Sequence, residues 1–149
     1  MSKIHWTDET INPVVGCSKI SAGCHNCYAE NMAQRLAAMG MKQCKETVKW
    51  VRGRELLPHH TGGWNGKTAF VLPELEKPRK WKQPRTIFIS SMGDLFHDTV
   101  DIKWQIKIMA MVAALQHHTF IMLTKRPSPW LIVRRIPDLN YALRALKHR

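Results

Sequence analysis

Two short runs of β-branched and aromatic residues stand out in the second half of the chain, at residues 85–90 and 119–124. The centre of each run is apolar, Ile-Phe-Ile at 87–89 and Phe-Ile-Met-Leu at 120–123, which predicts two buried strands. Residues 101–116 lie between them and carry apolar side chains every three or four positions, the spacing of a helix. We expect its buried face to hold Ile102, Ile106, Met109, Ala113 and Leu115. The order strand, helix, strand predicts an α/β fold with parallel strands.

The N-terminal part of the chain predicts a similar alternation. Residues 4–15 favour an extended segment with a turn at Asn12-Pro13. Residues 28–39 predict a helix that ends at Gly40. The apolar side chains that share one face of this helix are Tyr28, Met32, Leu36 and Met39.

Prolines and glycines interrupt residues 41–85, so we interpret this segment as an irregular basic insertion. Short helices are predicted within it over residues 46–54 and 73–81. The insertion belongs to one domain of residues 1–127. Residues 128–149 predict a basic helical tail, because a serine and a proline stand where a helix begins. The abrupt end of this tail leads us to expect a truncated or frameshifted copy of a longer protein.

The net charge of +12 is unevenly distributed. Residues 41–85 hold eleven basic and four acidic side chains, and residues 125–149 hold seven basic and one acidic. Tryptophans are interleaved with the first of these basic groups. Basic side chains neutralise phosphates and tryptophan stacks on bases, so residues 41–85 predict contact with nucleic acid. A solvated basic surface with its tryptophans packed inward is the alternative.

No segment predicts insertion into a membrane. The longest apolar stretch, residues 106–115, contains Lys107 and is shorter than a membrane span. Residues 1–19 lack the charged start and apolar run of a signal peptide. We therefore expect a cytoplasmic protein. In a reducing compartment, clustered cysteines are more often metal ligands or redox groups than disulfides.

Three cysteines, Cys17, Cys24 and Cys27, lie within eleven residues in the spacing C-x6-C-x2-C. Clustered thiolates bind zinc or an iron–sulfur cluster. Three ligands leave one coordination position open for a substrate or cofactor. For zinc, a fourth ligand could come from Cys44 or His25. A loop without metal is the remaining alternative, and Cys44 is otherwise interpreted as a partly buried free thiol.

Polar side chains follow both predicted strands: Ser90, Ser91, Asp94 and His97 after the first, and Thr124, Lys125 and Arg126 after the second. Ligand sites of parallel sheets form at these strand ends, so we expect one shared rim with the cysteine loop. Asp94 and His97 are candidates for acid–base or ligand work, with a turn cap and a surface residue as the alternatives. Lys125 and Arg126 predict binding of a carboxylate or phosphate, or else a solvated strand end.

Several strings of residues occur in a characteristic order. They are Asn-Pro-Val-Val-Gly-Cys at residues 12–17, Gly-Cys-His-Asn-Cys-Tyr-Ala-Glu at 23–30, Ser-Met-Gly-Asp-Leu-Phe-His at 91–97 and Leu-Thr-Lys-Arg-Pro at 123–127. With these strings, residues 4–127 resemble an uncharacterised phage and prophage protein family named gene product 37/gene product 68. The Asn-Pro-x-x-Gly-Cys opening and the Cys-Tyr-Ala ending are also similar to radical S-adenosylmethionine enzymes, notably the spore photoproduct lyase branch.

The resemblance implies an incomplete, radical-SAM-like partial (β/α) barrel in the cytoplasm of a bacterial host. It implies a [4Fe–4S] cluster on Cys17, Cys24 and Cys27, with S-adenosylmethionine bound at the free iron. By position, it implies cofactor-binding roles for Tyr28, Ser90, Ser91 and Asp94, and substrate-binding roles for Asp94 and Lys125. This loop has three more residues between its first two cysteines than the usual C-x3-C-x2-C loop, and Asn26 stands where an aromatic residue is common.

Three hypotheses for the function follow. The first is a phage-derived iron–sulfur protein that resembles radical S-adenosylmethionine enzymes, with an unknown substrate for which nucleic acid is the candidate. The second is a zinc-stabilised nucleic-acid-binding module without catalytic activity. The third is an inactive prophage fragment.

Overall fold

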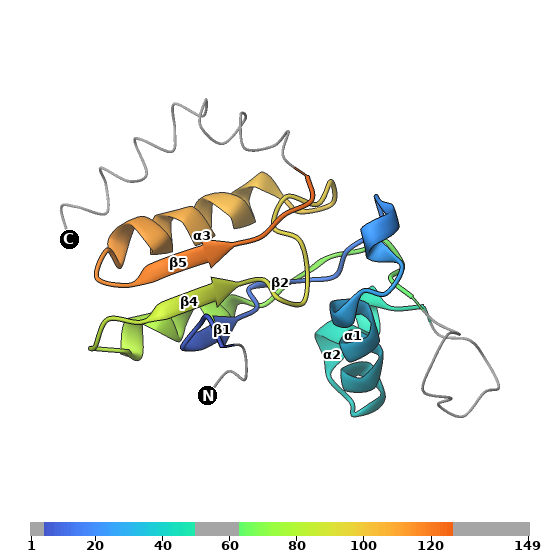
Figure 1. Cartoon of the computed structure of the whole chain (residues 1–149), viewed down its shortest axis with the longest axis horizontal. Helices are drawn as coiled ribbons and strands as arrows, with labels where there is room; N and C mark the ends of the chain where they lie inside the picture. The colour runs from blue at the N-terminus through green and yellow to red at the C-terminus, as the bar shows by residue number, and fades with distance from the viewer. Residues whose placement is uncertain (1–4, 50–62, 127–149) are drawn as a thin grey trace.

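A three-stranded parallel sheet forms the centre of the computed structural model, which describes residues 5–49 and 63–126 (Figure 1). Its strands lie in the order β1 (Glu9–Ile11), β4 (Thr86–Ile89) and β5 (Thr119–Met122), and both pairings are parallel. Parallel neighbours need crossover connections, as the order strand, helix, strand implied. The predicted α/β fold with parallel strands is confirmed, and the partial barrel stays a prediction.

A second, two-stranded sheet begins just after β1. β2 (Val14–Val15) pairs antiparallel with β3 (Ala69–Phe70), and two 3₁₀ helices follow β3: η2 (Leu72–Glu76) and η3 (Pro78–Lys80). These two turns stand where a short helix was predicted. Leu75 belongs to the main core and Pro78 is fully buried. The end of the predicted basic insertion is therefore packed onto the domain, although it has little regular structure.

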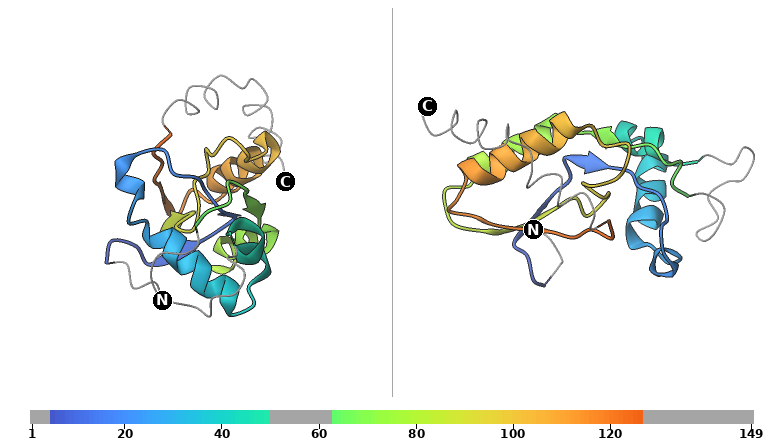
Figure 2. Two further views of the ribbon diagram at one scale, coloured as in Figure 1. Left: turned by 90° about the vertical axis from the view of Figure 1, so that its right-hand side faces the viewer. Right: turned by 90° about the horizontal axis from the view of Figure 1, so that it is seen from above.

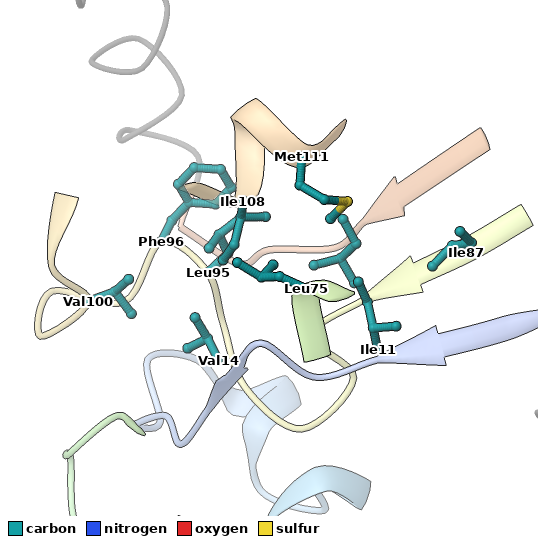
Figure 3. Close-up of a cluster of buried hydrophobic side chains, with 10 residues drawn as sticks. Ile11, Val14, Leu75, Ile87, Leu95, Phe96, Val100, Ile108 and Met111 are labelled. Carbon is teal, nitrogen blue, oxygen red and sulfur yellow. The ribbon is translucent and has the colours of Figure 1, made fainter. Parts of the chain in front are cut away.

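The main core lies between the parallel sheet and α3 (Ile102–Ala114), which runs along one face of the sheet (Figures 1 and 2). Figure 3 shows how side chains from the strands, the loop after β4 and the helix converge there. The buried members are Ile11, Val14, Leu75, Ile87, Ile89, Leu95, Phe96, Val100, Ile108 and Met111. The core therefore ties the loop after β4 to the sheet, and that loop carries several candidate site residues.

The buried face of α3 agrees only in part with the predicted one, since Met109 and Leu115 pack against the main core as predicted. Gln105, Ile108 and Met111 are its buried residues, whereas Ile102 is 42% exposed. The apolar periodicity of the sequence favoured the more apolar face of the helix, but the tertiary contacts bury a different face. Gln105 can be buried because its Nε2 donates to the Leu95 carbonyl oxygen at 3.0 Å, which satisfies its amide group.

Helices α1 (Tyr28–Ala38) and α2 (Lys42–Thr47) pack together beyond the end of the parallel sheet (Figure 1). The residues buried in this second cluster are Val15, Ala33, Ala37, Cys44, Val48, Trp64 and Met92. The predicted helix over residues 28–39 is present, but Tyr28 and Met39 of its apolar face are exposed. Small alanines face the partner instead, which lets the two helices approach closely.

Some predictions fall on residues that the structure does not describe. The tail helix of residues 128–149 lies outside the described part, and so does most of the helix predicted for residues 46–54. The boundaries of the domain are not tested either. Of the helices in residues 5–49 and 63–126, none has the length and apolar character needed to cross a membrane.

The inward face of α3 can be tested with two isoleucines of the same helix. Ile108→Ala should lower the free energy of unfolding by about 2–5 kcal/mol, because the side chain is fully buried. Ile102→Ala is the matched control and should change it by about 0.5 kcal/mol or less. Urea unfolding followed by circular dichroism measures both. A larger loss for Ile102→Ala would contradict the observed orientation of the helix.

Candidate functional site

The cysteine loop, residues 16–27, joins β2 to α1 and lies beside the segment that follows β5 (Figures 1 and 2). It opens at Gly16, where φ is +101° and an added Cβ would collide with the Lys67 carbonyl oxygen and the Thr47 side chain. Gly16 also pairs with Gly93 across a parallel bridge, its N–H donating to the Met92 carbonyl oxygen at 3.0 Å. Glycine is needed here because both the angle and the space exclude a side chain.

Asp94 joins the ends of β4 and β5. Its Oδ1 accepts hydrogen bonds from Phe96 N at 3.0 Å and from Thr124 Oγ1 at 2.8 Å. Its Oδ2 lies 3.1 Å from Arg126 Nη1 in a buried ion pair, with the two residues 6% and 8% exposed. Both carboxylate oxygens are therefore engaged inside the protein.

Arg126 carries this connection to the first cysteine. Its Nη1 also lies 3.5 Å from Cys17 Sγ, and its Nη2 donates to Ser18 O at 3.1 Å and to Ser18 Oγ at 2.9 Å. Burial raises the pKa of the Cys17 thiol, and the Arg126 guanidinium opposes that increase. One buried guanidinium thus holds the start of the loop against the sheet.

Lys125 reaches the second cysteine. Its Nζ donates to the Gly23 carbonyl oxygen at 2.9 Å and lies 3.5 Å from Cys24 Sγ. The backbone of Ile20, then the Ser21 hydroxyl and, to a smaller extent, Lys125 lower the pKa of Cys24 to about 7. The lowered pKa brings a substantial part of this thiol to the thiolate form at neutral pH.

His97 contacts the cysteine loop. Its side chain is buried, so the interpretation of His97 as a surface residue is wrong. Its Nδ1 accepts a hydrogen bond from Thr99 N at 3.2 Å, which leaves the proton on Nε2, 2.8 Å from Ser18 Oγ. Burial lowers the pKa of His97, and the positive charge of Arg126 lowers it further. The ring is thus a neutral hydrogen-bond donor to the loop.

An ion pair connects the cysteine loop to helix α1 as well. Lys19 Nζ lies 2.9 Å from Glu30 Oε2, and Glu30 Oε1 accepts from Trp64 N at 2.9 Å. Glu30 is buried at the beginning of α1, and an added Cβ at Gly63 would collide with its carboxylate. The loop is therefore attached both to the strand ends and to the helical pair.

Ser90 has the most unusual backbone among the predicted site residues. It follows the central strand β4 with φ at +63°, a left-handed angle that non-glycine residues seldom adopt. Its hydroxyl is buried and has no hydrogen-bond partner within the described part of the chain. Strain of this kind is concentrated at ligand sites.

The remaining predicted site residues are placed differently. Ser91 Oγ donates to Asn12 Oδ1 at 3.0 Å, and Met92 N donates to the same oxygen, so Ser91 stabilises the turn. Tyr28 is 66% exposed at the beginning of α1. Cys27 is half-buried immediately before that helix.

The structure thus brings Cys17, Cys24, Asp94 and Lys125 together, as the strand-end argument predicted. Sequence reasoning left Arg126 and His97 without a firm role and did not consider Ser18. In the sequence, only position pointed to these residues: Arg126 and His97 follow buried strands, and Ser18 stands next to a cysteine. All four cysteines are free thiols. Within residues 5–49 and 63–126, no three His, Cys, Asp or Glu side chains are gathered closely enough to hold a metal ion.

The reactivity of Cys24 tests the electrostatics of the loop. In metal-free protein, alkylation of Cys24 by iodoacetamide should reach half its maximal rate near pH 7 and slow as the pH falls, because the reactive thiolate is then protonated. Cys44, which is 1% exposed against 8% for Cys24 and has a raised pKa, is the internal control and should react far more slowly in the native state. Peptide mass spectrometry follows both sites. A half-maximal rate above pH 8.5 for Cys24 would contradict the assignment.

No curated protein matches the chain, and no solved structure matches it. The family described as protein of unknown function (DUF5131) matches residues 1–138, which include the cysteine loop and every strand-end residue described above. This agrees with the expectation of an uncharacterised family, whereas the phage name and the likeness to radical enzymes stay predictions. The chain belongs to the DUF5131 family of proteins of unknown function.

Proposed function

We propose that the cysteine loop holds an iron–sulfur cluster on Cys17, Cys24 and Cys27 in a protein that resembles radical S-adenosylmethionine enzymes. One observation carries the proposal: adjacent cations at the end of β5 reach two of the three cysteines, Lys125 to Cys24 and Arg126 to Cys17. A neutral thiol interacts only weakly with a cation. The arrangement suits sulfur that bears negative charge, as in a metal thiolate.

The donor groups are of the kind that such a cluster takes, but within residues 5–49 and 63–126 they are not gathered closely enough to hold a metal ion, so the proposal rests on their chemistry and not on their spacing. Thiolates are the ligands that iron–sulfur clusters take in proteins. Cys27 stands at the beginning of α1, where the helix dipole favours negative charge. The buried hydroxyl of Ser90, which has no partner among residues 5–49 and 63–126, offers a polar contact to a ligand at the strand end. A bound cluster with S-adenosylmethionine would supply radical chemistry that amino-acid side chains lack.

The protein's own residues position the loop for this role. Arg126, fixed by Asp94, holds Cys17 and Ser18, and the neutral His97 ring donates to Ser18. Since both oxygens of Asp94 are engaged, we assign it to positioning and not to direct contact with cofactor or substrate. The parallel sheet adds its strands in the order in which they occur along the chain, β1, β4 and β5, as a (β/α) barrel does, which supports the proposed partial barrel.

The competing proposal is a zinc-stabilised module that binds nucleic acid. Its support is the exposed basic stretch before β4, where Lys80 and Lys82 flank Trp81 and the Arg85 guanidinium lies 5.2 Å from the Trp81 ring centre. This stretch precedes β4, so it lies at the opposite end of the strand from Ser90 and the cysteine loop. Nucleic acid bound there would be distant from the cysteines.

The metal content decides between the two proposals. Protein purified without oxygen should contain iron and acid-labile sulfide, and its reduced EPR signal should change when S-adenosylmethionine is added. The variant Cys17→Ala/Cys24→Ala/Cys27→Ala should lose the iron, whereas Cys44→Ala should keep it. Zinc without sulfide would overturn the iron–sulfur proposal, and DNA binding that weakens steeply with salt would then favour the module.

A further inference from the structure

A single turn separates Cys24 from Cys27 in the cysteine loop. Cys24 ends the 3₁₀ helix η1 (Ala22–Cys24), residues 25–26 form a turn, and Cys27 stands immediately before α1. The Cα atoms at the two ends of a tight turn are less than about 7 Å apart, and a disulfide spans a Cα separation of about 4.4–6.8 Å. The turn therefore gives these two free thiols a backbone separation that a disulfide can bridge.

We propose that Cys24 and Cys27 are a redox pair that closes into a disulfide when the cysteine loop carries no metal. A metal site needs three or more ligands together, and no such group is gathered within residues 5–49 and 63–126. A disulfide needs only two thiols, so a geometry that is too open for a metal is sufficient for the pair. The disulfide depends on these thiols alone and does not rest on the proposed function.

The surroundings of the pair favour its reaction. Reactive cysteines lie in positively charged, partly exposed surroundings, whereas cysteines buried among apolar side chains are inert. Lys125 Nζ lies 3.5 Å from Cys24 Sγ, and Cys27 is only half-buried. The two residues between the cysteines, His25 and Asn26, are exposed, so a small oxidant can reach the turn.

The other two thiols are engaged elsewhere. Cys17 Sγ donates to the Ser18 carbonyl oxygen at 3.4 Å and lies 3.5 Å from the Nη1 atom of the buried Arg126. Cys44 is 1% exposed and belongs to the apolar cluster of the two helices α1 and α2. We therefore expect oxidation to be selective for the pair.

The oxidant is a low-molecular-weight disulfide, and the reaction consists of two successive thiol–disulfide exchanges. Cys27, the more exposed of the pair, attacks one sulfur of the oxidant as a thiolate; that S–S bond breaks, and one small thiolate leaves. Cys24, as a thiolate, then attacks the Cys27 sulfur of the mixed disulfide, and the second small thiolate leaves. The protein loses two electrons and two protons, which reduce the oxidant to two thiols.

Closure of the pair changes what the loop can bind. Metals take thiolates as ligands, and the disulfide removes two of the three thiolates that the proposed function assigns to the cluster. Oxidation therefore switches the loop from a form that can accept metal to a form that cannot. This consequence, unlike the disulfide itself, rests on the proposed function.

The experiment detects the disulfide directly. The full chain, freed of bound metal by a chelator under argon, is equilibrated with mixtures of reduced and oxidised glutathione, and the remaining thiols are labelled with N-ethylmaleimide. Trypsin releases a peptide of residues 20–35 that holds both cysteines of the pair, while Cys17 and Cys44 fall in two other peptides. The peptide of the pair should appear unlabelled and lighter by two hydrogen atoms, and the other two peptides should carry the label.

Folding should favour the disulfide, because the turn already holds the two cysteines close together. The equilibrium constant for its formation from glutathione should be about tenfold larger, or more, in native protein than in urea. Cys24→Ser should stop at a mixed disulfide between Cys27 and glutathione. Cys17→Ala and Cys44→Ala are the matched controls and should keep the wild-type constant.

Three results would overturn the inference: a doubly labelled pair at every glutathione ratio, a disulfide to Cys17, or an equilibrium constant no larger than in urea. Iron content, measured on the protein as purified, tests the proposed function separately. A protein without iron would overturn that function and leave the disulfide unaffected. Iron uptake by the oxidised protein would contradict the switch alone.

Discussion

The buried ion pair between Asp94 and Arg126 is the interaction on which the arrangement of the candidate site depends. Removing one member of a buried pair typically costs about 3–5 kcal/mol, because the remaining charge has no partner. Here the carboxylate also accepts from Phe96 N and Thr124 Oγ1, and the guanidinium also donates to Ser18. Each charge is thus satisfied from several directions, and the pair joins two strand ends to the cysteine loop.

Close backbone approach is the second constraint. Gly16 and Gly93 meet between the two hydrophobic clusters, and an added Cβ at Gly93 would lie 2.8 Å from the Val14 carbonyl oxygen. This contact lets the chain leave the small sheet and enter the cysteine loop without moving away from the loop after β4. Together with the Lys19–Glu30 pair, it anchors the thiols to both clusters.

The local sequence pattern predicted the secondary-structure elements well where one type of signal, strand or helix, dominated a segment. Runs of β-branched and aromatic residues predicted β4 and β5, and the helix signals predicted α1 and α3 within a few residues. The buried faces of both helices were predicted less well. In α1 the larger apolar side chains Tyr28 and Met39 stay exposed while Ala33 and Ala37 are buried, because a neighbouring helix selects small residues. In α3 the hydrogen bond of Gln105 makes a polar residue suitable for the core.

The sequence by itself determined that thiols are concentrated in one loop, that the strands are parallel, and that polar groups follow each strand. From these, the meeting of Cys17, Cys24, Asp94 and Lys125 could be expected. Folding was needed to bury and pair Arg126, to make His97 a neutral donor to Ser18, and to leave the Ser90 hydroxyl without a partner in the described part of the chain. The roles of Arg126 and His97 depend on contacts between residues 32 and 79 positions apart, and burial and partnership at such separations leave no periodic pattern in the chain.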